Sequence, residues 1–154
     1  MRSSAARCAL VAVLLLAPPG SRAAELPWDR ERVVSLAGQL ASEAEALYDE
    51  VFRQPIPVGV PDQRRDYHRL KRETRHLRDE ARHFARALSG GEGQEETAAS
   101  FEALLSSARW AEQRARTVFT VRQVQERAAR VHALLRELAR FYDEPGPLPE
   151  PYAR

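Results

Sequence analysis

Four long segments of this chain carry apolar side chains at alternating steps of three and four residues. That spacing places the apolar side chains along one side of an α-helix, as in helices that pack against other helices. Proline or glycine clusters separate the first three segments, at residues 55–61 and 90–93. The pattern therefore predicts an all-α chain built from packed helices.

Each apolar row forms one seam of the expected interior. The four seams are Val33, Ala37, Leu40, Ala44, Leu47 and Val51; Tyr67, Leu70, Thr74, Leu77, Ala81, Phe84 and Leu88; Phe101, Leu104, Ala108, Ala111, Ala115 and Val118; and Val121, Val124, Ala128, Val131, Leu135, Leu138 and Tyr142. No seam contains an acid, an arginine, a lysine or a histidine. We therefore expect a dry interior, with His68, His76, His83 and His132 on the surface.

The ends of the segments carry helix-capping signals. Asp29 can cap the first segment, Asp62 the second, and Glu95 and Glu96 suit the start of the third. The run Asp143-Glu144-Pro145-Gly146 is expected to end the fourth segment.

The junction of the third and fourth segments contains no glycine or proline. The seam loses phase there, because Ala115, Val118 and Val121 follow two successive steps of three, and Thr120 with Gln123 has the spacing of a capping box. We expect a tight turn near Phe119 and Thr120, which gives an up-down-up-down four-helix bundle. The alternative is a helical hairpin plus one helix of about 48 residues, roughly 70 Å long.

The first residues have the order of a secretory signal peptide. Arg2 and Arg7 precede an apolar run that is too short to span a bilayer, and Ser21 and Ala23 suit the small positions before a cleavage site. We expect residues 1–23 to be a cleaved signal peptide, 24–144 the bundle and 145–154 a proline-rich tail. The mature protein would then be periplasmic or secreted.

Cleavage after Ala23 changes which chemistry the chain can carry. The mature residues have a net charge of −1, so the excess of basic residues in the precursor is no argument for nucleic-acid binding. Cys8 and Met1, the only cysteine and methionine, leave with the signal peptide. This excludes disulfides and thiolate, thioether or covalently attached haem ligation in the mature chain.

Two Glu-x-x-His spacings resemble half of a di-iron motif. Glu73 with His76 and Glu80 with His83 lie on the same segment, whereas a di-metal bundle needs this motif on two helices that face each other. We therefore predict no metal site and no cofactor. The sequence also lacks a nucleophile elbow and a phosphate-binding glycine loop, so we expect no enzyme.

The second segment carries a ladder of arginines. As structure, the ladder keeps the helix soluble and pairs with acids of the first segment. As function, it is a candidate surface for an anionic partner, with Arg65, Arg69 and Arg72 as candidate binding residues. Trp110, which lies off the third seam, is a further candidate for the partner surface, or else part of a wide core stripe.

One short stretch, Phe119-Thr120-Val121-Arg122-Gln123, resembles the Leu-Thr-x-x-Gln repeat of the periplasmic Spy and CpxP stress chaperones, which are small exported all-helical proteins. The resemblance covers five residues, once, with Phe in place of Leu. Together these features predict an exported bundle, monomeric or homodimeric, that binds another protein or an envelope component in an accessory or chaperone-like role. The alternative function is a metal- or haem-binding helical bundle.

Overall fold

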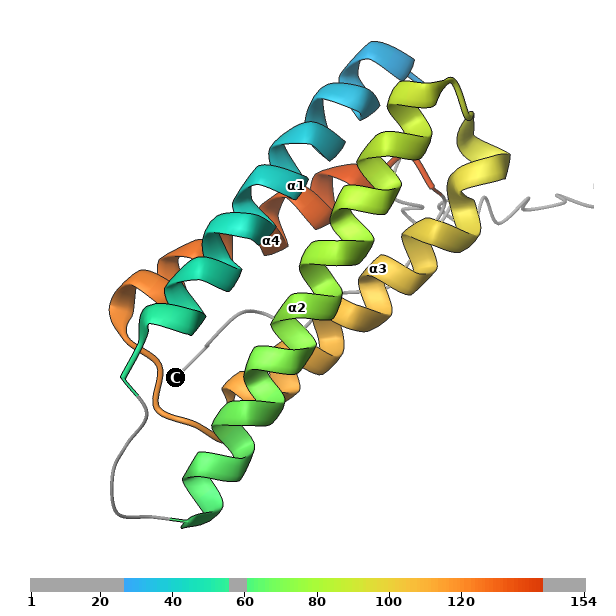
Figure 1. Ribbon diagram of the computed structural model, residues 1–154. Helices are drawn as coiled ribbons and strands as arrows, with labels where there is room; N and C mark the ends of the chain where they lie inside the picture. Colours follow the sequence, from blue (N-terminus) through green and yellow to red (C-terminus); the bar gives the residue numbers. More distant parts are fainter. Residues whose placement is uncertain (1–26, 56–60, 143–154) are drawn as a thin grey trace, which may run out of the picture.

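A computed structural model describes residues 27–55 and 61–142 of the chain, and these residues form four α-helices and no strand. The helices are α1 (Arg30–Arg53), α2 (Pro61–Gly90), α3 (Gln94–Ala115) and α4 (Arg122–Ala139) (Figure 1). The expected all-α class is confirmed for this part of the chain. The expected signal peptide, the tail and the stop signal at Asp143 to Gly146 lie outside the described residues.

The four helices form a helical bundle in which neighbours run antiparallel (Figure 1). Helix α1 packs against α2 and α4, and α2 also packs against α3. Contacts between helix ends fix these directions. Arg30 at the start of α1 donates to the carbonyl oxygens of Leu88 and Gly91 at the end of α2, and Gln94 at the start of α3 donates to the carbonyl of Phe141 after α4.

Helix boundaries follow the capping signals in part. Asp29 is the N-cap of α1, where its side chain accepts a hydrogen bond of 3.1 Å from the Arg32 amide. Helix α2 begins at Pro61, one residue before Asp62, and the predicted capping by the Asp62 side chain lies outside what the structure describes. Proline suits this first position because its missing N–H has no partner there in any helix. Gly91 follows α2 with φ of 113°, a left-handed conformation that glycine adopts at helix ends.

The junction of α3 and α4 is a turn, so the alternative of one 48-residue helix is wrong. The predicted capping box of Thr120 and Gln123 is also wrong, because α4 begins at Arg122 without a side-chain cap from its own segment. Gln54, after α1, supplies the contacts instead. Its side chain donates to the Phe119 carbonyl at 2.7 Å and accepts from the Val121 amide at 3.2 Å. This buried amide fixes the turn from another part of the chain.

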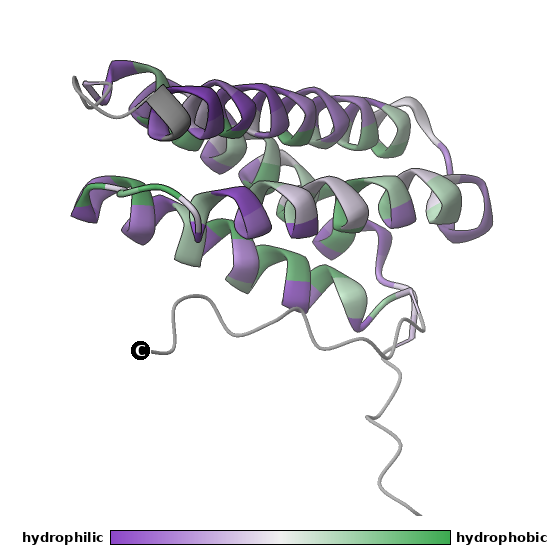
Figure 2. Ribbon diagram, turned by 90° about the horizontal axis from the view of Figure 1, so that it is seen from below, coloured by the Kyte–Doolittle hydropathy of each residue, from purple (hydrophilic) through white to green (hydrophobic). Residues whose placement is uncertain are grey.

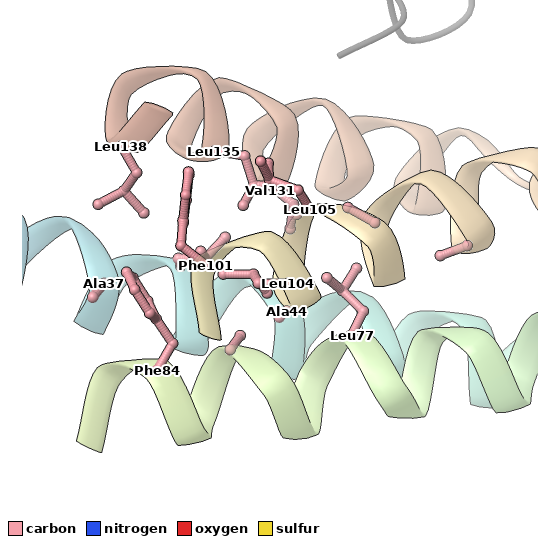
Figure 3. Packing of buried hydrophobic residues seen from close by; sticks show 14 of the residues in the cluster. Ala37, Ala44, Leu77, Phe84, Phe101, Leu104, Leu105, Val131, Leu135 and Leu138 are labelled. Carbon is pink, nitrogen blue, oxygen red and sulfur yellow. The ribbon is translucent and has the colours of Figure 1, made fainter. Parts of the chain in front are cut away.

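One end of the interior is filled by aromatic rings. Phe84 of α2 and Phe101 of α3 lie 5.6 Å apart between ring centroids, and Tyr142 stacks on Phe101 at 4.4 Å. Trp28 meets the edge of the Tyr142 ring at 5.5 Å. Figure 3 shows Phe84 and Phe101 turned inward at the same end of the bundle as Leu138 of α4. We call this region the filled end.

The other end of the interior contains a cavity of about 30 Å³, which is room for little more than one water molecule. All four helices contribute to its lining, which is made mostly of small or aliphatic side chains with three polar residues. The lining residues are Leu47, Val51, Leu70, Thr74, Leu77, Ala108, Ala111, Glu112, Ala115, Val124, Ala128, Val131 and His132. We call this region the hollow end. Four alanines line its cavity, whereas aromatic rings fill the interior at the other end.

Candidate functional site

The solvent-facing side of α2 is a continuous polar surface. Every exposed residue of α2 between positions 65 and 86 belongs to it, and we call this set the outer face of α2. Its members are Arg65, His68, Arg69, Arg72, Arg75, His76, Asp79, Arg82, His83 and Arg86. Six arginines and three histidines therefore stand against a single acid. In Figure 2, α2 is the long helix at the top of the view, and hydrophilic residues colour most of its length.

The outer face includes the three arginines that the sequence singled out. Arg65, Arg69 and Arg72 are all exposed and follow one another along a single helix, because steps of four and three return to the same side. Trp110 lies on the neighbouring helix α3, and half of its surface (51%) is exposed. The structure thus places Trp110 at the surface rather than in a core stripe. Its position on another helix makes it a separate feature from the arginines.

The acids of α2 lie mostly beside the outer face. Asp66, Glu73 and Glu80 are half-buried, while the exposed Asp79 is the one acid within the face. Arg69 contacts Asp66 at 3.4 Å, and Arg72 contacts Glu73 at 2.9 Å. Exposed pairs of this kind hold their side chains only weakly. The outer face therefore keeps an excess of positive charge, and α2 as a whole has nine basic and five acidic residues.

Basic side chains of α2 also cover two aromatic rings of α1. The Arg78 guanidinium lies 4.2 Å from the centroid of Tyr48, and the Lys71 ammonium lies 4.5 Å from that of Phe52. The hydrogen bond from Arg78 to Asp79 raises the pKa of the Arg78 guanidinium further above its ordinary value, with desolvation acting in the opposite direction. Cation–π contacts at such distances stabilise the α1–α2 pair modestly. Arg78 and Lys71 therefore have a structural role, because they help to hold α2 against α1.

A surface groove runs between α1 and α2 beside the outer face. It has a volume of about 590 Å³, and its lining combines small side chains with charged ones. The lining residues are Ala41, Asp79, Arg82, Ala85, Arg86 and Ser89. Arg82 also pairs with Glu45 of α1, and Arg86 donates to the Arg82 carbonyl. Two arginines of the outer face are thus part of a hollow large enough for a small polar group.

The prediction of an interior without ionisable groups is wrong at one place. His132 of α4 and Glu112 of α3 are both buried, with 6% and 3% of their side chains exposed, and His132 Nε2 lies 3.6 Å from Glu112 Oε2. Arg116, at the surface, donates to the other carboxylate oxygen at 2.6 Å. Both buried side chains line the cavity of the hollow end. They join α3 to α4 by a polar contact within an otherwise apolar lining.

Glu112 and His132 each lie beside a seam rather than on it, which explains why the apolar periodicity did not predict their burial. Each residue directly follows a seam residue, Ala111 or Val131, and the two side chains approach each other between α3 and α4. Leu105, seven residues before Glu112, is buried at the same helical position. A leucine widening the seam on that side was the one available signal that Glu112 would be covered.

The remaining histidines are exposed, as expected. His68, His76 and His83 belong to the outer face of α2, and Glu73 and Glu80 do not join His76 or His83 in a cluster. Among residues 27–55 and 61–142, no group of three or more histidine, cysteine, aspartate or glutamate side chains is arranged to hold a metal ion. Glu112 and His132 together offer two potential ligands, fewer than the three protein ligands of an ordinary catalytic zinc site.

Comparison with known proteins gives no relative: no protein family, no curated protein and no solved structure matches the chain. Within the part of the chain that the structure describes, no helix has both the length and the apolar character to cross a bilayer. The geometry of the outer face of α2 is therefore the basis for a functional argument.

Proposed function

We propose that this chain is an exported, non-enzymatic helical bundle that binds another protein or a component of the cell envelope through the outer face of α2. The mature protein would act in the periplasm or outside the cell, after removal of residues 1–23, in an accessory or chaperone-like role. The observation that carries the proposal is the outer face itself, with six exposed arginines and one acid along a single helix.

The charge of the other helices supports this choice of surface. Helices α1 and α3 carry more acidic than basic residues, and α4 carries four arginines with two acids. Two of the four α4 arginines pair with α1, since Arg127 and Arg130 contact Glu43 at 2.8 and 3.8 Å. The longest basic surface in the described bundle therefore lies on α2. Arginine suits recognition of carboxylates and phosphates because its planar fork donates two parallel hydrogen bonds.

The experiment reverses charge on this face and measures retention by the envelope. The variant Arg65→Glu/Arg69→Glu/Arg72→Glu is expressed in the native host, and washed envelope fractions are assayed for the protein. We expect wild type in the envelope fraction and the variant largely released. Loss of helical circular dichroism is not expected, because all three side chains are exposed.

A matched control keeps the total charge change the same. Arg109→Glu/Arg122→Glu/Arg140→Glu alters three exposed arginines, on α3, at the start of α4 and directly after α4, and should be retained like wild type. Equal retention of both triple variants would overturn the proposal. If wild type itself is absent from envelope fractions and from cross-linked complexes, a partner-binding role also fails.

A metal- or haem-binding bundle remains the second candidate, favoured by one observation. Glu112 supplies a buried carboxylate and His132 a buried imidazole, which are the ligand types that such a role would use. Elemental analysis and visible absorbance of the protein purified from its host test this reading. A metal or haem at one equivalent, lost in His132→Leu, would support it, and metal-free, colourless protein would remove it.

A further inference from the structure

The outer face of α2 contains no apolar side chain from Arg65 to Arg86, and this limits the kind of partner it can bind. Specific protein interfaces have a dry core in which a few aromatic or aliphatic anchors supply most of the binding energy. The exposed aromatic residues Phe52, Trp110 and Phe119 belong to α1, α3 and the α3–α4 turn. Phe52 borders the outer face, since the Arg75 guanidinium lies 6.0 Å from the centroid of its ring, but the face itself offers a protein partner charge without an apolar anchor.

The shape of the face also matters. The ten residues extend along about 30 Å of one helix, at 1.5 Å per residue. Figure 1 shows α2 as a straight helix at the front of the bundle, with no other described element in front of it. A straight, charged ridge can touch a flat surface along its whole length.

A third observation concerns hydrogen-bond chemistry. Arg82, Arg86 and one acid, Asp79, line the groove of about 590 Å³ between α1 and α2, together with the small side chains of Ala41, Ala85 and Ser89. Arg82 also pairs with Glu45 at the surface of α1. One guanidinium group can donate two parallel hydrogen bonds to the oxygens of a phosphate. An open groove leaves room for a phosphate to approach the two arginines. The groove therefore adds a recess for a single phosphate group to the extended positive ridge.

From these three observations we infer that the partner of the outer face is the surface of a bilayer containing anionic phospholipid. The ridge lies on the headgroups without inserting, because it has no apolar side chain to bury. Binding is electrostatic and depends on anionic lipid and on low salt. Phosphodiester groups contact the arginines, and one of them can occupy the groove at Arg82 and Arg86. This inference rests on the proposed function and specifies its partner.

The test measures co-sedimentation of the full chain with two kinds of vesicle. One contains phosphatidylglycerol and phosphatidylcholine, and the other phosphatidylcholine alone. Each of several arginines near an anionic surface strengthens binding severalfold, so we expect Arg65→Glu/Arg69→Glu/Arg72→Glu to weaken binding to the anionic vesicles by on the order of a hundredfold. The control Arg109→Glu/Arg122→Glu/Arg140→Glu should lose much less. Intact mass confirms that all variants share one N-terminus.

Variants with neutral side chains test whether weaker binding comes from lost positive charge rather than from a damaged fold. Arg65→Gln/Arg69→Gln/Arg72→Gln removes charge without placing new acids beside Asp66 and Glu73, and it should still bind more weakly than the control. Arg82→Gln/Arg86→Gln should weaken binding as well, through the groove. Circular dichroism establishes that each variant is helical before its binding is compared.

The outcomes separate the lipid inference from the proposed function. Binding to anionic vesicles that falls with salt and with the α2 variants supports both. Retention by native envelope that depends on Arg65, Arg69 and Arg72, without binding to anionic vesicles, overturns the lipid inference and leaves a protein partner. Equal binding to both vesicle types, or equal weakening by the α2 and control variants, also overturns it.

Discussion

The two ends of the bundle are held together in different ways. At the filled end, Phe84, Phe101 and Tyr142 pack ring against ring, and the buried Tyr142 hydroxyl lies 2.7 Å from the Thr97 hydroxyl. At the hollow end, small side chains leave a cavity of about 30 Å³, and polar contacts connect the helices around it. One end depends on the volume of its side chains, and the other on the positions of its hydrogen-bonding groups.

Three buried polar residues illustrate the second mode. Tyr67 places its hydroxyl 2.6 Å from the Val51 carbonyl and 3.0 Å from that of Gln54, Gln54 fixes the turn before α4, and Glu112 lies beside His132. Buried polar groups are costly when a partner is lost, whereas buried rings are costly when volume is lost. The two ends should therefore respond to different substitutions.

The largest expected effect is at the filled end. Phe101→Ala removes a fully buried ring that contacts both Phe84 and Tyr142, and we expect a loss of about 3–5 kcal/mol in the free energy of unfolding. Urea titration followed by circular dichroism measures it. Phe119→Ala, at a ring that is 72% exposed, is the control and should change stability by no more than about 0.5 kcal/mol. Equal losses would remove the distinction between packed and exposed rings.

A matched pair of small-to-large substitutions compares the two ends directly. Ala37→Val adds volume beside Phe84 at the filled end (Figure 3) and should cost about 1–3 kcal/mol through overpacking. Ala108→Val adds the same volume at the cavity of the hollow end, where each newly buried methylene-sized group is worth about 0.8 kcal/mol. We expect Ala108→Val to be more stable than Ala37→Val by on the order of 2 kcal/mol. The opposite order in thermal and urea unfolding would contradict the comparison.

Loss of one amide should weaken the hollow end at its turn. Gln54→Ala leaves the Phe119 carbonyl and the Val121 amide without their side-chain partner, and we expect a cost of about 1–3 kcal/mol. Gln39→Ala, where the amide is exposed and donates to the Ser35 hydroxyl of the same helix, should be nearly neutral. Hydrogen exchange should also become faster near residues 119–121 in Gln54→Ala alone. Unchanged exchange there would mean that Gln54 does not hold the turn.

Alkaline pH should weaken the bundle through a buried tyrosine. Burial raises the pKa of Tyr67 from its ordinary value of 10.0 to about 12. The folded state thus favours the neutral phenol, so its contribution to stability is complete below pH 10 and is lost as the pH rises through 12. Tyr67→Phe should be less stable at neutral pH and lose less stability between pH 10 and 12. Parallel pH profiles of wild type and Tyr67→Phe, from urea midpoints, would contradict this.

The filled end was predictable from the sequence and the hollow end only in part. The periodicity identified Phe84, Phe101 and Leu138 as core residues because alternating steps of three and four keep them on one side of a helix. The same periodicity assigned Glu112 and His132 to the outside. How far burial spreads around a helix depends on the neighbouring helix, and one seam does not contain that information.

The outer face of α2 was also predictable from the sequence only in part. The sequence placed Arg65, Arg69 and Arg72 on one helical segment, which also carries five acids. Asp66, Glu73 and Glu80 are half-buried at the edge of the face, so the exposed surface is more basic than the composition of the helix. Two of these acids still pair with arginines of the face, Asp66 with Arg69 and Glu73 with Arg72. The turn before α4 was expected at the right place, but its partner Gln54 lies 65 residues away from Phe119 and could not be found from local pattern.

Because the cavity of the hollow end has room for little more than one water molecule, we expect recognition to occur on the outside of the bundle. The only cysteine of the chain is Cys8, so one introduced thiol among the described residues can report on contact there. The most direct measurement is the rate of thiol labelling of His76→Cys, in the middle of the outer face of α2, with and without native envelope. We predict strong protection of His76→Cys by the envelope and none of Ala133→Cys, an exposed position on α4. Equal labelling rates at the two positions in the presence of envelope would contradict the account.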